Sequence, residues 1–153
     1  MPQLLKGGKY VFAWTRVSAS GRIVIPPEAA AEYRLLDSQR LIVLPGSRTS
    51  GGLAVGSLVT LQRSALGSVL AALPDLLSCR IPEAATIVHR GKPYCWVRLL
   101  DGAFLLPRAT LARYGLDSGV LLLVVRGSGL AVGFAVRGRI VEEAKKHPDL
   151  EVF

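Results

Sequence analysis

Residues 16–26 read Arg-Val-Ser-Ala-Ser-Gly-Arg-Ile-Val-Ile-Pro, an order of residue types that indicates two strands joined by a turn. The first strand is expected over residues 9–17, which are rich in aromatic and β-branched side chains. The small residues that follow break it, and residues 22–25 form a short apolar strand. Two prolines then end this strand and suit the first turn of a helix.

The same order recurs in the second half of the chain. Residues 21–26 (Gly-Arg-Ile-Val-Ile-Pro) align with residues 102–107 (Gly-Ala-Phe-Leu-Leu-Pro), and residues 52–56 (Gly-Leu-Ala-Val-Gly) recur identically at 129–133. Further matches pair Trp14 with Trp96, Arg16 with Arg98, and Tyr33 with Tyr114. We therefore predict two repeats, residues 4–77 and 86–153, that face each other across a pseudo-twofold axis.

Periodicity and turn residues predict the remaining elements. In the first repeat these are a Gly7–Gly8 turn before the first strand, a helix at 28–34, strands at 40–44 and 53–61, and a helix at 63–73 that stops at Pro74. In the second repeat they are strands at 87–90 and 94–100 around a Gly91–Lys92 turn, an Asp101–Gly102 turn, strands at 103–106, 120–125 and 130–136, and helices at 108–114 and 139–147. The prediction is a mainly β fold with short helices (α+β), closed into a barrel, with a helix after each repeat.

The string Gly-Arg-apolar-apolar-Ile-Pro at residues 21–26, in its strand–strand–helix–strand–strand context, resembles the AbrB/MazE/SpoVT family. The resemblance covers residues 9–61 and, through the duplication, residues 92–136. Two tandem copies with a helix after each look like the MraZ-like, two-repeat members of that superfamily. The resemblance implies a swapped-hairpin barrel, here closed within one chain, and DNA binding by arginines on one face, as in transcription regulators or antitoxins.

The charge agrees with a polyanionic partner. The chain has 19 Lys and Arg against 11 Asp and Glu, a formal charge of +8, and a basic surface attracts nucleic acid through its overall field. Arg16 and Arg22 match basic positions of the family, and Arg98 is the counterpart of Arg16, whereas Ala103 replaces the motif arginine in the second repeat. The candidate contacts to duplex DNA are Lys9, Arg16, Arg22, Arg90, Lys92 and Arg98. The alternative is a non-catalytic scaffold or ligand-binding barrel that has lost DNA binding.

Two glycine-rich turns are candidate anion sites, because a glycine loop that exposes amides beside an arginine can hold an anion. The residues are Arg48, Gly51 and Gly52 in the first turn, and Arg126, Gly127 and Gly129 in the second. The competing interpretation is a tight strand connection whose backbone requires glycine.

Other function classes find no support in the sequence. There is no G-x-S-x-G elbow, and Cys79 and Cys95 form no metal-binding spacing, so we expect no catalysis, metal or cofactor. No apolar run approaches the roughly 18 residues that span a bilayer, and the N-terminal stretch has no long apolar segment. We expect a cytoplasmic protein without a membrane partner, whose 50% hydrophobic content favours a homo-oligomer.

Overall fold

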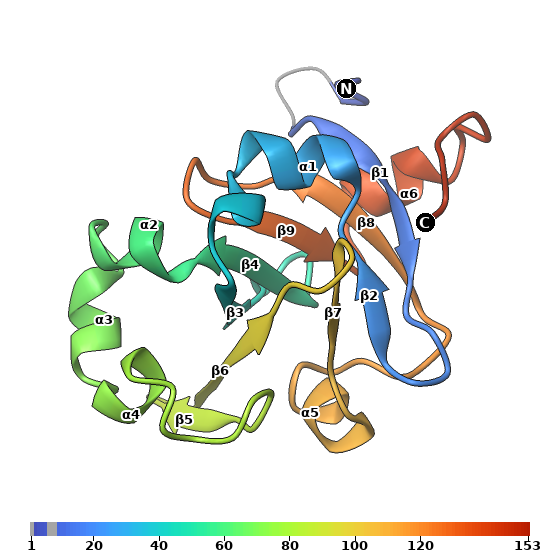
Figure 1. The fold of residues 1–153 in the computed structure, drawn as a ribbon. Helices are drawn as coiled ribbons and strands as arrows, with labels where there is room; N and C mark the ends of the chain where they lie inside the picture. Colours follow the sequence, from blue (N-terminus) through green and yellow to red (C-terminus); the bar gives the residue numbers. More distant parts are fainter. Residues whose placement is uncertain (1, 6–8) are drawn as a thin grey trace.

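The computed structural model describes residues 2–5 and 9–153, and it shows a strand-rich α+β fold with short helices, as predicted (Figure 1). The expected Gly7–Gly8 turn lies outside the described residues. The first half of the chain forms β1 (Val11–Arg16), β2 (Arg22–Val24), α1 (Pro27–Glu32), a 3-10 helix (Leu35–Asp37), β3 (Arg40–Pro45), β4 (Leu53–Ser57), α2 (Leu58–Gln62), α3 (Gly67–Ala71) and α4 (Pro74–Leu77). The second half forms β5 (Ile87–His89), β6 (Lys92–Arg98), β7 (Ala103–Leu105), α5 (Arg108–Arg113), β8 (Leu121–Arg126), β9 (Val132–Ala135) and α6 (Arg139–Ala144).

The strand pairings between the two halves are reciprocal. β1 pairs with β8 of the second half, and β3 pairs in the same antiparallel sense with β6. Strands β2 and β7 pair with each other, with Ile23 opposite Phe104, and β4 pairs with β9, with Val55 opposite Val132. Each of these two residue pairs joins positions that are aligned in the sequence, so both ladders contain a pair of matching residues from the two halves.

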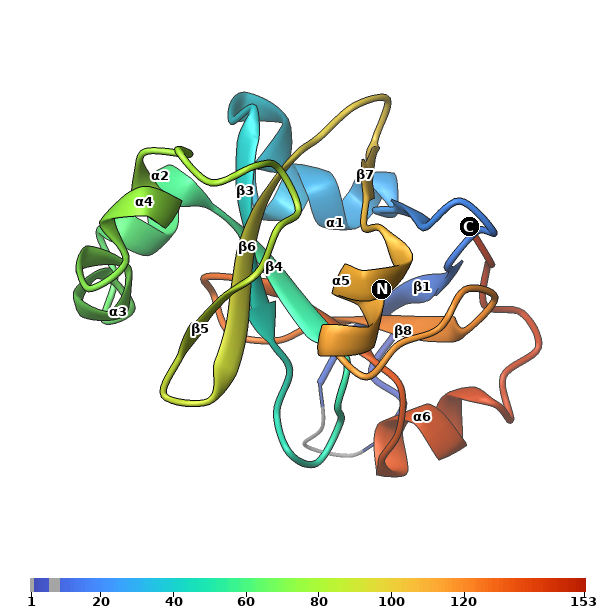
Figure 2. The ribbon, with the colours of Figure 1, turned by 90° about the horizontal axis from the view of Figure 1, so that it is seen from below.

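Burial follows the same reciprocal plan. The main core cluster takes side chains from both halves, including Ile23 and Phe104. A second cluster lies under α2, α3 and α4 and contains Trp96 of the second half, whereas a third lies beside α6 and contains Trp14 of the first half. The helices that follow the two halves lie on opposite flanks of the molecule (Figures 1 and 2). Each flanking helix group thus covers the tryptophan of the other half.

The expected closed barrel is wrong. In the part of the chain that the structure describes, the seven-stranded sheet runs β1-β8-β9-β4-β3-β6-β5 and stays open at β1 and β5, while β2 and β7 form a separate ribbon. One reason is that the outer edge of β1 is taken by the C-terminal segment, where the Phe153 amide donates to the Trp14 carbonyl (2.9 Å). The edge of β6 is likewise taken, by β5.

Some element boundaries also differ from the prediction. The strand expected over residues 53–61 ends at Ser57, because the Ser57 hydroxyl accepts the Thr60 amide (3.1 Å) and caps α2. Of the helix expected over residues 63–73, only residues 67–71 are helical (α3), and Pro74 begins α4 instead of ending a helix. Lys92 belongs to β6, and the turn before it is made by Arg90 and Gly91, which both have positive φ.

Candidate functional site

Arg16 and Arg22 flank the turn that joins β1 to β2. The turn is fixed by the Ser18 hydroxyl, which accepts the Arg22 amide (2.9 Å), and by the Gly21 amide, which donates to the Ser18 carbonyl (2.9 Å). Arg16 is exposed and donates from Nη1 to the Gly119 carbonyl (2.9 Å). A carbonyl does not neutralise a guanidinium, so both arginines present their charge to solvent.

Arg98 ends β6 and faces Arg40 across the β3–β6 ladder. The two guanidinium carbons lie 5.8 Å (Arg98) and 5.9 Å (Arg40) from the centre of the Trp96 ring, within cation–π range. This arrangement holds two cations side by side on the electron-rich ring. Arg40 was not among the residues predicted from the sequence. The second half has Leu121 at the corresponding place, opposite Arg16, so the repeat gave no signal for Arg40.

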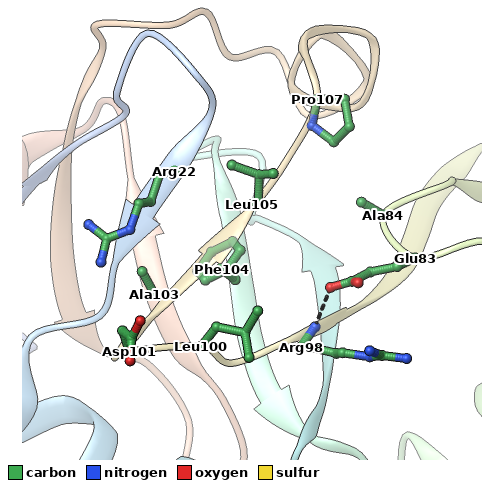
Figure 3. Close-up of a pocket in the computed structure, with 10 residues that line it drawn as sticks. All are labelled: Arg22, Glu83, Ala84, Arg98, Leu100, Asp101, Ala103, Phe104, Leu105 and Pro107. Carbon is green, nitrogen blue, oxygen red and sulfur yellow. Dashed lines mark hydrogen bonds between the residues drawn. The ribbon is translucent and has the colours of Figure 1, made fainter.

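Arg22 and Arg98 lie on opposite sides of one pocket of about 350 Å³ (Figure 3). Its floor is apolar and comes mainly from β7, with Phe104 nearly buried (2% exposed) and Leu105 about half exposed. Asp101 and Glu83 also line the pocket. The Glu83 carboxylate accepts the Arg98 amide (2.8 Å), so it fixes the end of β6 and places a negative charge beside the arginine (Figure 3).

The six residues proposed to contact DNA do not form one cluster. Arg16, Arg22 and Arg98 lie at the far ends of β1 and β6 or just after the turn, as described above. Lys92 begins β6, and six residue steps at about 3.4 Å place it roughly 20 Å from Arg98. Lys9 precedes β1 and lines a small cavity beside the β3–β4 turn, and Arg90 lies in the β5–β6 turn. The structure thus separates the set into two groups.

The cations of both groups are free of carboxylate partners. Within residues 2–5 and 9–153, none of the six takes part in an ion pair. Other basic residues of the chain are paired at the surface, for example Arg34 with Asp37 and Arg80 with Asp75. The six candidates therefore present uncompensated charge, as do seven other basic residues of the described part of the chain: Arg40, Arg48, Arg63, Arg108, Arg113, Arg137 and Arg139.

The two glycine-rich turns differ in their electrostatics. In the second turn, Arg126 pairs with Glu32 and lies over the Tyr10 ring (5.2 Å), so its charge is largely compensated. In the first turn, Arg48 has no carboxylate partner among the described residues, and the turn lines a cavity that also receives Lys92. The Gly51 amide is used inside the turn, where it donates to the Ser47 carbonyl (2.8 Å). The Gly51 amide is therefore not available to an anion at the first turn.

The buried polar groups are structural. The Tyr114 hydroxyl donates to the Val43 carbonyl (2.9 Å) and contacts the Cys95 sulfur (3.6 Å). Burial raises the pKa of the Cys95 thiol to about 11, despite the opposing hydrogen bond from Tyr114. The same burial raises the pKa of Tyr114. Trp14, Trp96, Tyr33 and Tyr114, which occupy matching positions of the two repeats, are all buried and pack in the core clusters.

The described residues form neither a cluster of metal ligands nor a membrane-spanning helix. Among residues 2–5 and 9–153, no three His, Cys, Asp or Glu side chains are grouped as metal ligands would be. No helix formed by these residues has the length and apolar character needed to cross a bilayer. Comparison with known proteins gave no match to a family model, a curated protein or a solved structure.

Proposed function

We propose that this chain is a DNA-binding protein of the AbrB type, in which two repeats within one chain exchange hairpins. The reciprocal ladders support this architecture. Strand β1 pairs outside its own half, with β8, and β6 does the same with β3. Two independent ladders place matching residues opposite each other, Ile23 with Phe104 in one and Val55 with Val132 in the other. A pseudo-twofold axis through both pairs accounts for all four pairings at once.

The proposed contact surface is the group Arg16, Arg22 and Arg98, extended by Arg40. The observation that carries the proposal is that these arginines are exposed, lie around one turn and one pocket, and have no ion-pair partner among the described residues. Free guanidinium groups bind phosphate oxygens in bidentate fashion and position a protein on the duplex. The role in vivo would be transcriptional regulation.

The test measures binding to a pool of fluorescently labelled duplexes of random sequence. Fluorescence anisotropy monitors the binding over a range of salt concentrations. Binding should be measurable at low salt and weaken steeply as salt rises, because phosphate contacts release counterions. The double variant Arg16→Gln/Arg22→Gln should bind much more weakly than the unaltered protein, with a shallower dependence on salt. Absence of binding by the unaltered protein even at low salt would contradict the proposal and favour the scaffold or ligand-binding alternative.

Assembly into a homo-oligomer stays a prediction. Leu100 and Leu105 are large apolar side chains exposed at the pocket between Arg22 and Arg98. Their exposure is compatible with a second copy, and a second copy would double the number of phosphate contacts. Sedimentation with and without duplex measures this directly.

A further inference from the structure

A cationic cavity lies at the other end of the molecule from Arg16 and Arg98. It has a volume of about 430 Å³, within the range of ligand pockets. Its basic side chains come from four separate segments: the β3–β4 turn, the start of β6, the end of α5 and the segment that follows β9. The basic residues are Arg48, Lys92, Arg113 and Arg137.

Among the residues that the structure describes, no acidic side chain lines this cavity. In the described part of the chain, none of its four cations forms an ion pair with a carboxylate. Like charges gathered at one place repel one another, so the empty cavity has a positive potential that an anion would relieve. This distinguishes it from the pocket at Arg22 and Arg98, which contains Asp101 and Glu83.

The cavity wall is built in advance of any ligand. Arg137 donates from Nη2 to the Arg48 carbonyl (3.0 Å), and its amide donates to the Ser50 carbonyl (3.1 Å). A side chain at Gly51 would collide with the Arg137 guanidinium, since an added Cβ would lie 2.5 Å from Nη1. Glycine at this position therefore lets Arg137 lie flat against the turn, with a fixed direction.

The number of positive charges around the cavity indicates a ligand that carries several negative charges. A single small anion cannot compensate four cations around a cavity of this size, whereas a chain of linked phosphates carries several charges and many acceptor oxygens. Arginine binds such groups through two parallel hydrogen bonds, and lysine binds them as a compact charge. Tyr114 is the one aromatic residue among the described residues of the lining. It is buried and donates its hydroxyl to the Val43 carbonyl, so it offers no stacking face for a base.

We propose that this cavity, formed by the β3–β4 turn, Lys92, Arg113 and Arg137, binds an oligophosphate, that is, two or more linked phosphate groups. The shared chemistry is found in free polyphosphate and in the phosphate chain of a nucleoside triphosphate. The site is independent of the duplex contacts proposed above, because it uses different arginines at the opposite end of β6.

The experiment is calorimetric titration of the full chain with tripolyphosphate, adenosine triphosphate and orthophosphate at physiological salt. We expect tripolyphosphate to bind at least tenfold more tightly than orthophosphate. Equal affinity for tripolyphosphate and the nucleotide would identify the phosphate chain as the recognised part, and tighter binding of the nucleotide would add a contact outside the cavity. No binding of tripolyphosphate, or equal binding of orthophosphate, would overturn the proposal.

The variant Lys92→Gln/Arg113→Gln should weaken tripolyphosphate binding at least tenfold. The matched control is Arg63→Gln/Arg139→Gln, which removes the same charge from exposed residues outside the cavity lining and should change affinity less than threefold. Equal weakening by the two variants would mean non-specific attraction and would overturn the proposal. The proposal would also be overturned if Lys92→Gln/Arg113→Gln kept tripolyphosphate binding but lost duplex binding. The cavity would then belong to a DNA surface.

Amide chemical shifts of the unaltered protein give a second readout that needs no variant. Titration with tripolyphosphate should move the signals of Gly46, Gly51 and Gly115, which line the cavity, and leave Gly102 unmoved. Shifts confined to residues outside the cavity would overturn the proposal. Loss of duplex binding in Arg16→Gln/Arg22→Gln with tripolyphosphate affinity retained would separate the two sites.

Discussion

Ile23 lies directly opposite Phe104 in the β2–β7 ladder, with both side chains buried in the core shared by the two halves. The Phe104 ring also meets the Phe134 ring edge to face, with 6.0 Å between the ring centres. The centre of the ribbon is therefore joined to the main sheet through one aromatic contact. This geometry makes the ribbon a support for the turn that carries Arg16 and Arg22.

Truncation at the centre of the ribbon should destabilise the whole fold. Phe104→Ala is expected to lower the free energy of unfolding by about 3–5 kcal/mol, because it removes a buried ring and leaves a cavity. Leu105→Ala, the next residue, is a control with an exposed side chain and should cost less than about 1 kcal/mol. Urea unfolding followed by tryptophan fluorescence measures both, and equal costs would contradict a ribbon centred on Phe104.

The two aligned glycines of the repeat should respond differently to alanine. Gly21 has φ +87°, and an added Cβ would lie 2.0 Å from the Leu106 carbonyl oxygen, whereas Gly102 (φ +74°) has open space around it. Gly102→Ala should cost about 1 kcal/mol from its backbone conformation alone. Gly21→Ala should cost clearly more, because the backbones of β2 and β7 must also separate. Thermal unfolding of the two variants tests this, and the reverse order would contradict the close approach.

Stability should fall in alkaline solution. The unfolded Cys95 thiol ionises near pH 9.0, but burial raises the folded pKa to about 11, so the unfolded state loses its proton first as pH rises. The contribution is fully present below pH 9 and is lost towards pH 11, by about 3 kcal/mol at most. The raised pKa of Tyr114 acts in the same direction.

Urea unfolding at pH 8 and pH 10.5 measures the effect. Cys95→Ala should show a smaller loss of stability between the two pH values than the unaltered protein. Cys79→Ala is the control, because it removes a thiol that is only partly buried. Identical losses in the Cys95 and Cys79 variants would show that the buried thiol does not contribute.

The sequence predicted the elements that local rules govern. The Asp101–Gly102 turn was recognisable because both residues adopt positive φ, which Asp and Gly tolerate. The repeat aligned Ile23 with Phe104, but their position opposite each other in one ladder was not predicted. The open sheet was not predictable, because it depends on the C-terminal segment pairing with Trp14, a contact between distant residues with no motif. The sequence also did not predict that the six candidate DNA contacts are divided between the two ends of the molecule. Spacing along a strand does not show which end of the strand faces a partner.

Removing the acidic residue beside the proposed DNA contacts should strengthen binding. Asp101 lines the same pocket as Arg22, and its φ of 51° is one that asparagine tolerates, so Asp101→Asn should leave the fold unchanged. Duplex affinity should rise about two- to fivefold at low salt, and the gain should disappear at high salt. Glu142→Gln on α6 removes the same charge elsewhere and serves as the control in the anisotropy assay. A gain of the same size in both variants would indicate a net-charge effect.

The group Arg16, Arg22 and Arg98 is tested most sharply by substitution of all three with glutamine. The matched control is the triple variant Arg63→Gln/Arg139→Gln/Lys146→Gln. It removes the same charge from exposed positions outside this group. Circular dichroism and the unfolding midpoint of each variant establish that both remain folded.

The decisive measurement is the slope of log binding constant against log salt concentration for the unaltered protein and these two variants on one duplex pool. Each lost phosphate contact lowers the slope by about 0.9, so the first variant should bind more weakly, with a slope smaller by roughly three. The matched variant should keep nearly the full slope. Equal slopes for the two variants would contradict the assignment of DNA binding to Arg16, Arg22 and Arg98.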